Sequence, residues 1–214
     1  MKIERIRWAI RFAARVLPLT FLVGSLGAQM QVAARAQSFG VSVQTATLNQ
    51  TSPSAALSPD GSVTQDQAAE VTVGSLVTAQ NAFATADGLS DDTQSDAFSS
   101  ATLGTVNILN GLITADGVIA MASTTLGNNN ADGSTLANLV VNGVQLSDPA
   151  PNTRVDLPGV GYVVLNEQIA TSGGITVNMI HVVLQQPALD VLGGVTGYQT
   201  TGEIIVGSAS TGIN

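Results

Sequence analysis

The chain has 214 residues, no cysteine, one histidine, and seven basic against fifteen acidic residues. Six of the basic residues precede residue 37, so the remainder carries Arg154 alone against fourteen acids, a formal net charge of −13. A surface of that sign repels phosphate, which argues against nucleic acid and anionic lipid as partners. The absence of cysteine excludes disulfides and thiol catalysis, and one histidine is too few for the usual zinc or copper sites.

The first 36 residues have the layout of a secretion signal. A basic start precedes an apolar run at 16–28, and Ala34-Arg35-Ala36 places small residues at a cleavage site. The alternative is a retained membrane anchor, which needs roughly 20 apolar residues, more than this run supplies. We therefore expect residues 1–36 to be a signal peptide cleaved after Ala36, with Gly27 or Ala28 as the second choice.

Residues 37–214 have the composition of an all-β domain. Thr and Val, which suit a half-buried pleated surface, are frequent, whereas Lys, Arg and Glu are nearly absent. No fixed-period repeat is present, which disfavours a solenoid or propeller. We predict a single β-sandwich, with a jelly-roll arrangement as one option. We expect it to be secreted or held at the cell surface, without a transmembrane segment.

In chain order, the first elements follow from alternation and from turn residues. Residues 39–48 alternate polar and apolar side chains and are expected to form a strand. Residues 49–60 contain two prolines and are expected to be a surface excursion. We expect residues 71–84 to be one strand and residues 87–96 to be a polar acidic loop.

Two Asn-Gly pairs predict hairpins, because these residues adopt the positive φ angles of a tight turn. The first hairpin has strands at 101–109 and 112–126 around the turn Asn110-Gly111, with a bend at Asp116-Gly117. The second has strands at Leu139–Val141 and Val144–Leu146 around the turn Asn142-Gly143. A third hairpin is expected from 161–170 and 175–184, with its turn at 171–174. Residues 128–134 are expected to be a loop, and 202–208 a last strand.

Strict alternation assigns faces to the return strand at 175–184. It places Ile175, Val177, Met179, His181 and Val183 on one face and the residues between them on the other. Both faces are largely apolar, so we expect this strand to be central in the sandwich.

Residues that could carry chemistry are few. His181, the only histidine, lies in the predicted return strand, where a half-buried structural role is commoner than catalysis. There is no G-x-S-x-G elbow or glycine-rich phosphate loop, so we expect no catalytic residues, no cofactor and no enzyme activity. Arg154 is expected to pair with Asp156 and fasten a proline-rich loop. The aromatic residues are expected to fill the core, leaving few for a sugar-binding platform: Phe39, Phe83, Phe98, Tyr162 and Tyr198.

Calcium is the one metal that this composition favours, because its ligands are oxygens. One stretch matches the first half of a calcium loop, but Leu139 stands where the glutamate ligand is required. A second acidic stretch could equally be a solvated loop. The weak calcium candidates in the two stretches are Asp87, Asp91, Asp92, Asp96, Asn128, Asn130 and Asp132.

Four runs of sequence resemble the choice-of-anchor P family of exported prokaryotic proteins. They are NGLITADGV (110–118), PAPNTRVDLPGVGYVVLNEQ (149–168), GGITVNMIHVVL (173–184) and GEIIVGSA (202–209), and together they span about residues 103–209. The resemblance implies export and a common domain to which different members attach different C-terminal anchors. It implies no catalytic residues. No sorting motif or apolar tail follows residue 209 here, so we expect release or non-covalent attachment.

These observations favour a secreted or cell-surface structural or interaction protein, such as a matrix or non-covalent filament subunit. In a filament, residues 39–48 would add as a strand to a neighbouring copy; the alternative is that they form the first strand of their own sheet. No lysine follows Lys2, so lysine–asparagine crosslinks are excluded beyond it. The second class of function is a secreted calcium- or carbohydrate-binding module, or a hydrolase. We expect protein partners or self-assembly.

Overall fold

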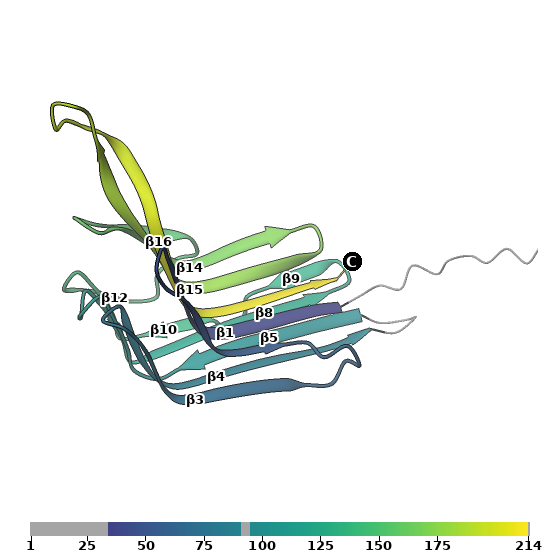
Figure 1. Ribbon diagram of the computed structural model, residues 1–214. Coiled ribbons are helices and arrows are strands. Elements are labelled where there is room, and N and C mark those ends of the chain that lie inside the picture. Colours follow the sequence, from purple (N-terminus) through teal and green to yellow (C-terminus); the bar gives the residue numbers. More distant parts are fainter. Residues whose placement is uncertain (1–33, 91–94, 214) are drawn as a thin grey trace, which may run out of the picture. The chain divides into compact units, whose positions relative to one another are not determined.

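Two antiparallel sheets, and no helix, make up residues 34–90 and 95–213, the part of the chain that the computed structural model describes. The first sheet has the order β13 (Thr153–Leu157), β14 (Gly161–Thr171), β15 (Gly174–Leu189), β16 (Val195–Ile213), β1 (Ala34–Thr45) and β2 (Asn49–Ala56) (Figure 1). The predicted all-β fold is therefore confirmed. In these residues no helix is long and apolar enough to cross a membrane.

The second sheet is built from shorter strands. Its order is β10 (Thr135–Ala137), β8 (Gly117–Thr125), β5 (Ser95–Leu103), β4 (Val77–Ser90), β6 (Val106–Ile108), β7 (Ile113–Ala115), β11 (Leu139–Val141) and β12 (Val144–Leu146). In addition, β3 (Thr64–Val73) pairs with β4, and β9 (Asn128–Asn130) pairs with β8. Strands that follow one another in the chain are mostly neighbours, so the order is a meander and not the paired Greek keys of a jelly roll.

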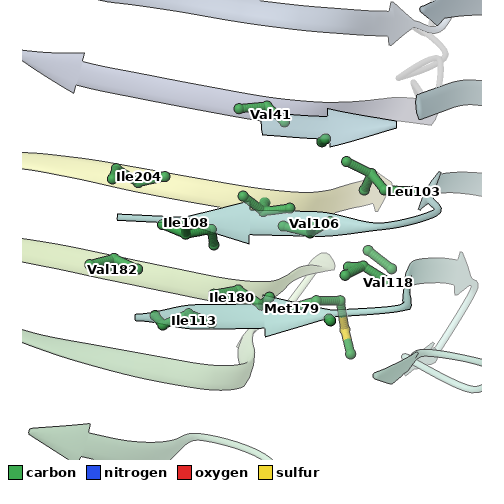
Figure 2. Packing of buried hydrophobic residues seen from close by; sticks show 14 of the residues in the cluster. Val41, Leu103, Val106, Ile108, Ile113, Val118, Met179, Ile180, Val182 and Ile204 are labelled. Atoms are coloured by element: carbon green, nitrogen blue, oxygen red, sulfur yellow. The ribbon is translucent and has the colours of Figure 1, made fainter. Parts of the chain in front are cut away.

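The core lies between the two sheets and is aliphatic. Ile108, Ile113, Ile180 and Ile204 are fully buried in one large cluster (Figure 2). A second, smaller cluster consists of alanines only, which lets the two sheets approach closely: Ala36, Ala55, Ala84, Ala86 and Ala97. The expectation that the aromatic residues fill the core is wrong. Four of them are half-buried and Tyr198 is exposed, because β-branched residues and alanines already fill the space.

Both sheets bend along one line, which we call the crease. Side chains of a regular strand alternate between the two faces, but here each central strand of the first sheet turns two successive residues toward the core. Met179 and Ile180 are both fully buried in the main cluster. The pairing of β15 with β16 skips Met179 and the opposing Gly207. A Cβ at Gly207, whose φ is +69°, would lie 2.6 Å from Val118 of the second sheet.

In the second sheet the crease appears as two successive outward residues on each strand. Buried apolar residues then stand three apart instead of two, as in Ala79/Ala82, Leu103/Val106, Ala115/Val118 and Leu136/Leu139. Three breaks between successive strands lie along the crease: those between β5 and β6, between β7 and β8, and between β10 and β11. Asn138, with φ +50°, donates from Nδ2 to Asp116 Oδ2 at 2.9 Å and ties two of these breaks together.

Two strand predictions in the first part of the chain are wrong. Residues 49–56 form β2, which pairs with β1 at the edge of the first sheet. Pro53 is tolerated there because an edge strand has one side without ladder bonds. Residues 71–84 form a hairpin and not one strand. Gly74, at φ +53°, lets Leu76 N donate to Val73 O and the chain reverse.

The three predicted hairpins are confirmed. Asn110-Gly111 and Asn142-Gly143 all have positive φ and connect paired strands. Thr171 pairs with Gly174 at the third turn, and β15 and β16 run further than expected. Parts of two predicted loops are strands, since residues 128–130 belong to β9, and residues 87–90 and 95–96 belong to β4 and β5.

The predicted signal lies almost wholly in residues 1–33, outside the described residues. Its expected end at Ala36 falls inside β1, where residues 34–36 pair with residues 211–213 of β16. Cleavage after Ala36 would remove these three pairs, whereas cleavage after Gly27 or Ala28 would keep β1 whole.

Candidate functional site

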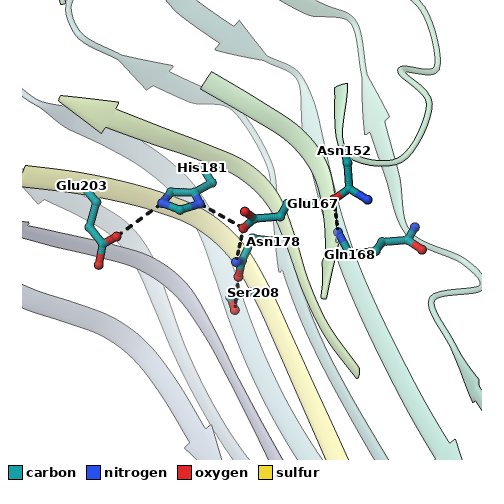
Figure 3. Close-up of polar contacts among 7 residues, drawn as sticks. All are labelled: Asn152, Glu167, Gln168, Asn178, His181, Glu203 and Ser208. Carbon is teal, nitrogen blue, oxygen red and sulfur yellow. Dashed lines mark hydrogen bonds and ion pairs between the residues drawn. The ribbon is translucent and has the colours of Figure 1, made fainter. Parts of the chain in front are cut away.

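A polar network crosses the outer face of the first sheet at the crease. His181 Nδ1 lies 2.9 Å from Glu167 Oε2, and His181 Nε2 lies 3.3 Å from Glu203 Oε2 (Figure 3). Asn178 Nδ2 donates to the same Glu167 oxygen at 2.7 Å, and Ser208 Oγ donates to Asn178 Oδ1 at 2.7 Å. The network joins β14, β15 and β16. Side chains from both sides of the crease take part, so the network fixes the bend.

The two carboxylates favour the charged form of the histidine. The hydrogen bond with Glu167 raises the pKa of His181 above its ordinary 6.5, against the effect of burial, and the charge of Glu203 adds to the rise. The same hydrogen bond lowers the pKa of the Glu167 carboxyl below its ordinary 4.5. As an imidazolium, His181 donates from both ring nitrogens. Both nitrogens are then occupied, an arrangement that suits an ion-pair staple better than a proton shuttle.

Alternation along β15 predicted the wrong neighbours for His181. It placed His181 with Met179 and Val183, whereas the crease puts Met179 on the core side and His181 beside Asn178. Glu167 and Glu203 were missed as partners. The signal for Glu167 was available, because counting back from the 171–174 turn pairs Glu167 with Asn178. Glu203 comes from a strand whose register the sequence does not display.

Arg154 forms the contact that was expected of it, although on a strand and not in a loop. Its Nη2 lies 3.2 Å from Asp156 Oδ1, and its guanidinium lies 3.8 Å from the centre of the Tyr162 ring on β14. Both charged side chains are more than half exposed. The ion pair lies within the edge strand β13 and contributes little to stability, as exposed pairs do, whereas the contact with Tyr162 crosses from β13 to β14.

Two of the calcium candidates, Asn130 and Asp96, accept hydrogen bonds from the backbone. Asn130 Oδ1 accepts from Asp132 N in a local turn, and Asn129 donates to Thr171 O. Asp96 Oδ1 accepts from Leu89 N across the β4–β5 pair. Asp91 and Asp92 lie outside the described residues. Within the described ranges, no three His, Cys, Asp or Glu side chains are placed to hold a metal ion.

The most exposed apolar side chains gather on an element that the sequence did not predict. Beyond the pairs Gly161–Leu184 and Thr45–Gly202, β15 and β16 continue as a two-stranded ribbon, residues 185–200, which we call the arm (Figure 1). In the described chain, half of the large exposed apolar side chains belong to the arm: Leu189, Val191, Leu192, Val195 and Tyr198. Soluble monomers rarely group such side chains without a binding role.

The tip of the arm is an ordered turn. Asp190 Oδ1 accepts from Leu192 N at 2.9 Å and Gly194 N at 2.7 Å, and Asp190 N donates to Gly194 O. Gly193 takes φ +83° inside this turn. Val191 and Leu192 are thereby held outward, 100% and 91% exposed. A tip that is fixed before binding loses less conformational entropy when it meets a partner.

No protein-family model matches the chain, and no curated protein or solved structure matches it either.

Proposed function

We propose that this protein is an exported interaction protein of the cell surface or extracellular matrix, and that the arm is its binding element. The observation that carries the proposal is the tip, where Val191 and Leu192 are held in water by the Asp190 turn. Burying two such side chains against a partner is worth about 1.5–3 kcal/mol for each. The basic and apolar N-terminal sequence supports export, as does the resemblance to the choice-of-anchor P family.

The arm also offers backbone for pairing. Beyond Gln185, whose N–H donates to Val160 O, its two strands pair only with each other among the strands that the structure describes, so each presents a strand edge to a partner. Asp190 is the only charged residue in residues 185–200 of a chain that is otherwise strongly acidic. The arm therefore brings apolar surface and strand edges to a contact without bringing much charge.

Retention at the surface of native cells tests this proposal. The test variant is Val191→Ser/Leu192→Ser, and the matched control is Leu126→Ser/Val144→Ser. These control side chains are 65% and 60% exposed and lie outside the arm, Leu126 in a turn and Val144 at the start of β12. We expect the test variant to shift into the medium and the control to stay with the cells. Equal retention of the two variants, with both exported and folded, would contradict the proposal.

A calcium-binding module is the second candidate, on one specific observation. Asp87, Asp96, Ser123 and Thr125 line one pocket of about 350 Å³. These are oxygen ligands of the kind that calcium prefers. Calcium that binds there must raise the midpoint of thermal unfolding, and Asp87→Asn/Asp96→Asn must abolish the rise. An unchanged midpoint in calcium would remove this candidate.

A further inference from the structure

The arm has a counterpart at the other end of the same two strands. An open groove of about 910 Å³ lies where β15 begins and β16 ends, and its lining includes the 173–174 turn, residues 210–212 and residues 34–37 of β1. Its volume is within the roughly 300–1,000 Å³ of ligand pockets. Leu89 and Ile169 line it and are each 50% exposed, and Leu57 also belongs to the lining. The groove thus offers apolar side chains that stay exposed among the residues that the structure describes, 34–90 and 95–213.

We infer that the partner of the arm is a second copy of this chain, and that the arm tip of one copy enters the end groove of the next. The inference rests on the proposed function. Arm and groove lie at opposite ends of β15 and β16, so each copy that binds one neighbour presents a free arm or groove to another. A head-to-tail contact of this kind does not close on itself and produces a filament unless the rotation closes a ring.

The distribution of charge favours this pairing over other contacts between copies. With Arg35 included, residues 34–214 carry two bases against fourteen acids, a formal net charge of −12, so most faces of two copies repel each other. The arm contains one carboxylate, that of Asp190, which the backbone of its own turn engages. The groove lining contains Arg35 and Asp60, whose formal charges cancel. A tip-to-groove contact therefore joins two surfaces that each carry little net charge. Added salt should strengthen the contact by screening the repulsion between the acidic faces of the two copies.

The pairing and burial of β1 argue against the alternative in which β1 is donated to a neighbouring copy. β1 is paired on both sides within its own sheet, with β16 and with β2. Its residues Val41 and Val43 are fully buried. The donated-strand version of a filament would have to dismantle this core, whereas the arm is already free.

The test uses the exported protein and two variants that each lack one half of the contact. The arm variant is Val191→Ser/Leu192→Ser, and the groove variant is Leu89→Ser/Ile169→Ser. All four side chains are at least half exposed, so both variants should keep the thermal midpoint of the wild type. Mass is measured by sedimentation over a range of concentrations, at low and high salt.

We expect the wild type to grow in mass with concentration, more so at high salt, and each variant alone to remain a monomer. An equimolar mixture of the two variants should give a species of twice the monomer mass and nothing larger, because only one intact arm and one intact groove can meet. Assembly of the groove variant alone would overturn the inference in favour of an arm-to-arm contact. No complex in the mixture would also overturn it.

Two further outcomes separate this inference from the proposed function. A wild type that is monomeric at every concentration, with surface retention still lost in the arm variant, overturns the second-copy partner and leaves the proposed function standing. Flotation of the wild type, but not the arm variant, with vesicles of neutral phospholipid would identify a membrane as the partner and overturn the inference.

Discussion

Asn178 and His181 stand three residues apart on β15, yet both side chains bind the same oxygen of Glu167, at 2.7 and 2.9 Å. In a regular strand such residues point to opposite faces. They share a face here because the crease turns Met179 and Ile180 successively into the core. The polar network on the outer face and the aliphatic core beneath it are therefore two consequences of one bend.

Replacing His181 should produce a pH-dependent loss of stability. Because the pKa of His181 is raised in the folded state, its contribution is complete below pH 6.5 and is lost as pH rises through the folded pKa. The contribution of Glu167, whose pKa is lowered, is present above pH 4.5 and lost as pH falls through its folded pKa. His181→Gln should therefore cost most between pH 4.5 and 6.5, about 1–3 kcal/mol, measured by urea unfolding.

Glu203→Gln is the control for this pH profile. Its carboxylate is 38% exposed and makes the longer contact with the ring, so its loss should cost less than that of His181 at every pH. A His181→Gln cost that does not vary between pH 5 and pH 9 would contradict the ion-pair account.

Gly207→Ala should destabilise the sandwich by about 2 kcal/mol or more. Residue 207 takes a positive φ, and an added Cβ would meet Val118 on the opposite sheet at 2.6 Å. Gly197→Ala is the matched control, because no atom lies within 4 Å of a Cβ there. Thermal unfolding of the two variants gives the comparison, and equal midpoints would mean that the crease does not depend on glycine.

Asp190→Ala should loosen the tip of the arm without affecting the core. The substitution removes the acceptor for the N–H groups of Leu192 and Gly194. Hydrogen exchange at these two amides should become faster, while that of the buried strands stays as in the wild type. Asp190→Asn keeps an oxygen acceptor and should restore most of the protection. Unchanged exchange in the alanine variant would show that the turn does not hold the tip.

Mass spectrometry of the exported protein gives the cleavage site. The sequence pattern predicts Gln37 as the first residue. A mass that begins just after Gly27 or Ala28 would instead leave the three pairs between residues 34–36 and residues 211–213 in place. An uncleaved chain in the medium would contradict the signal-peptide interpretation.

Local signals in the sequence predicted the hairpins well. Asn142-Gly143 and Asn110-Gly111 need positive φ, and the structure has it at all four residues. Pro53 gives a false loop signal, because the sequence does not distinguish an edge strand, which tolerates proline, from a loop. Gly74 lies inside an apolar run that predicts one strand, although it supplies the turn between β3 and β4.

The candidate site was less predictable because it depends on pairing between distant segments. The crease is set by residues on both sheets at once, as the approach of Gly207 to Val118 shows. Glu203 meets His181 only through the β15–β16 register. The sequence did not predict the arm either. Its strands are extensions of β15 and β16, and the Gly193-Gly194 turn that connects them resembles an ordinary loop. The spacing of three between Ala115 and Val118 was a readable sign of the bend.

A fluorescent probe on the arm tests the central claim most directly, because a chain without cysteine accepts a single label. Gln199→Cys lies beside Tyr198 in the arm, and Gln145→Cys, equally exposed, lies on β12 as the control. Each labelled protein is mixed with excess unlabelled protein and, separately, with envelopes of native cells. The account predicts a blue shift and slower rotation at residue 199 and no change at residue 145. An unaltered signal at residue 199 in both mixtures would contradict it.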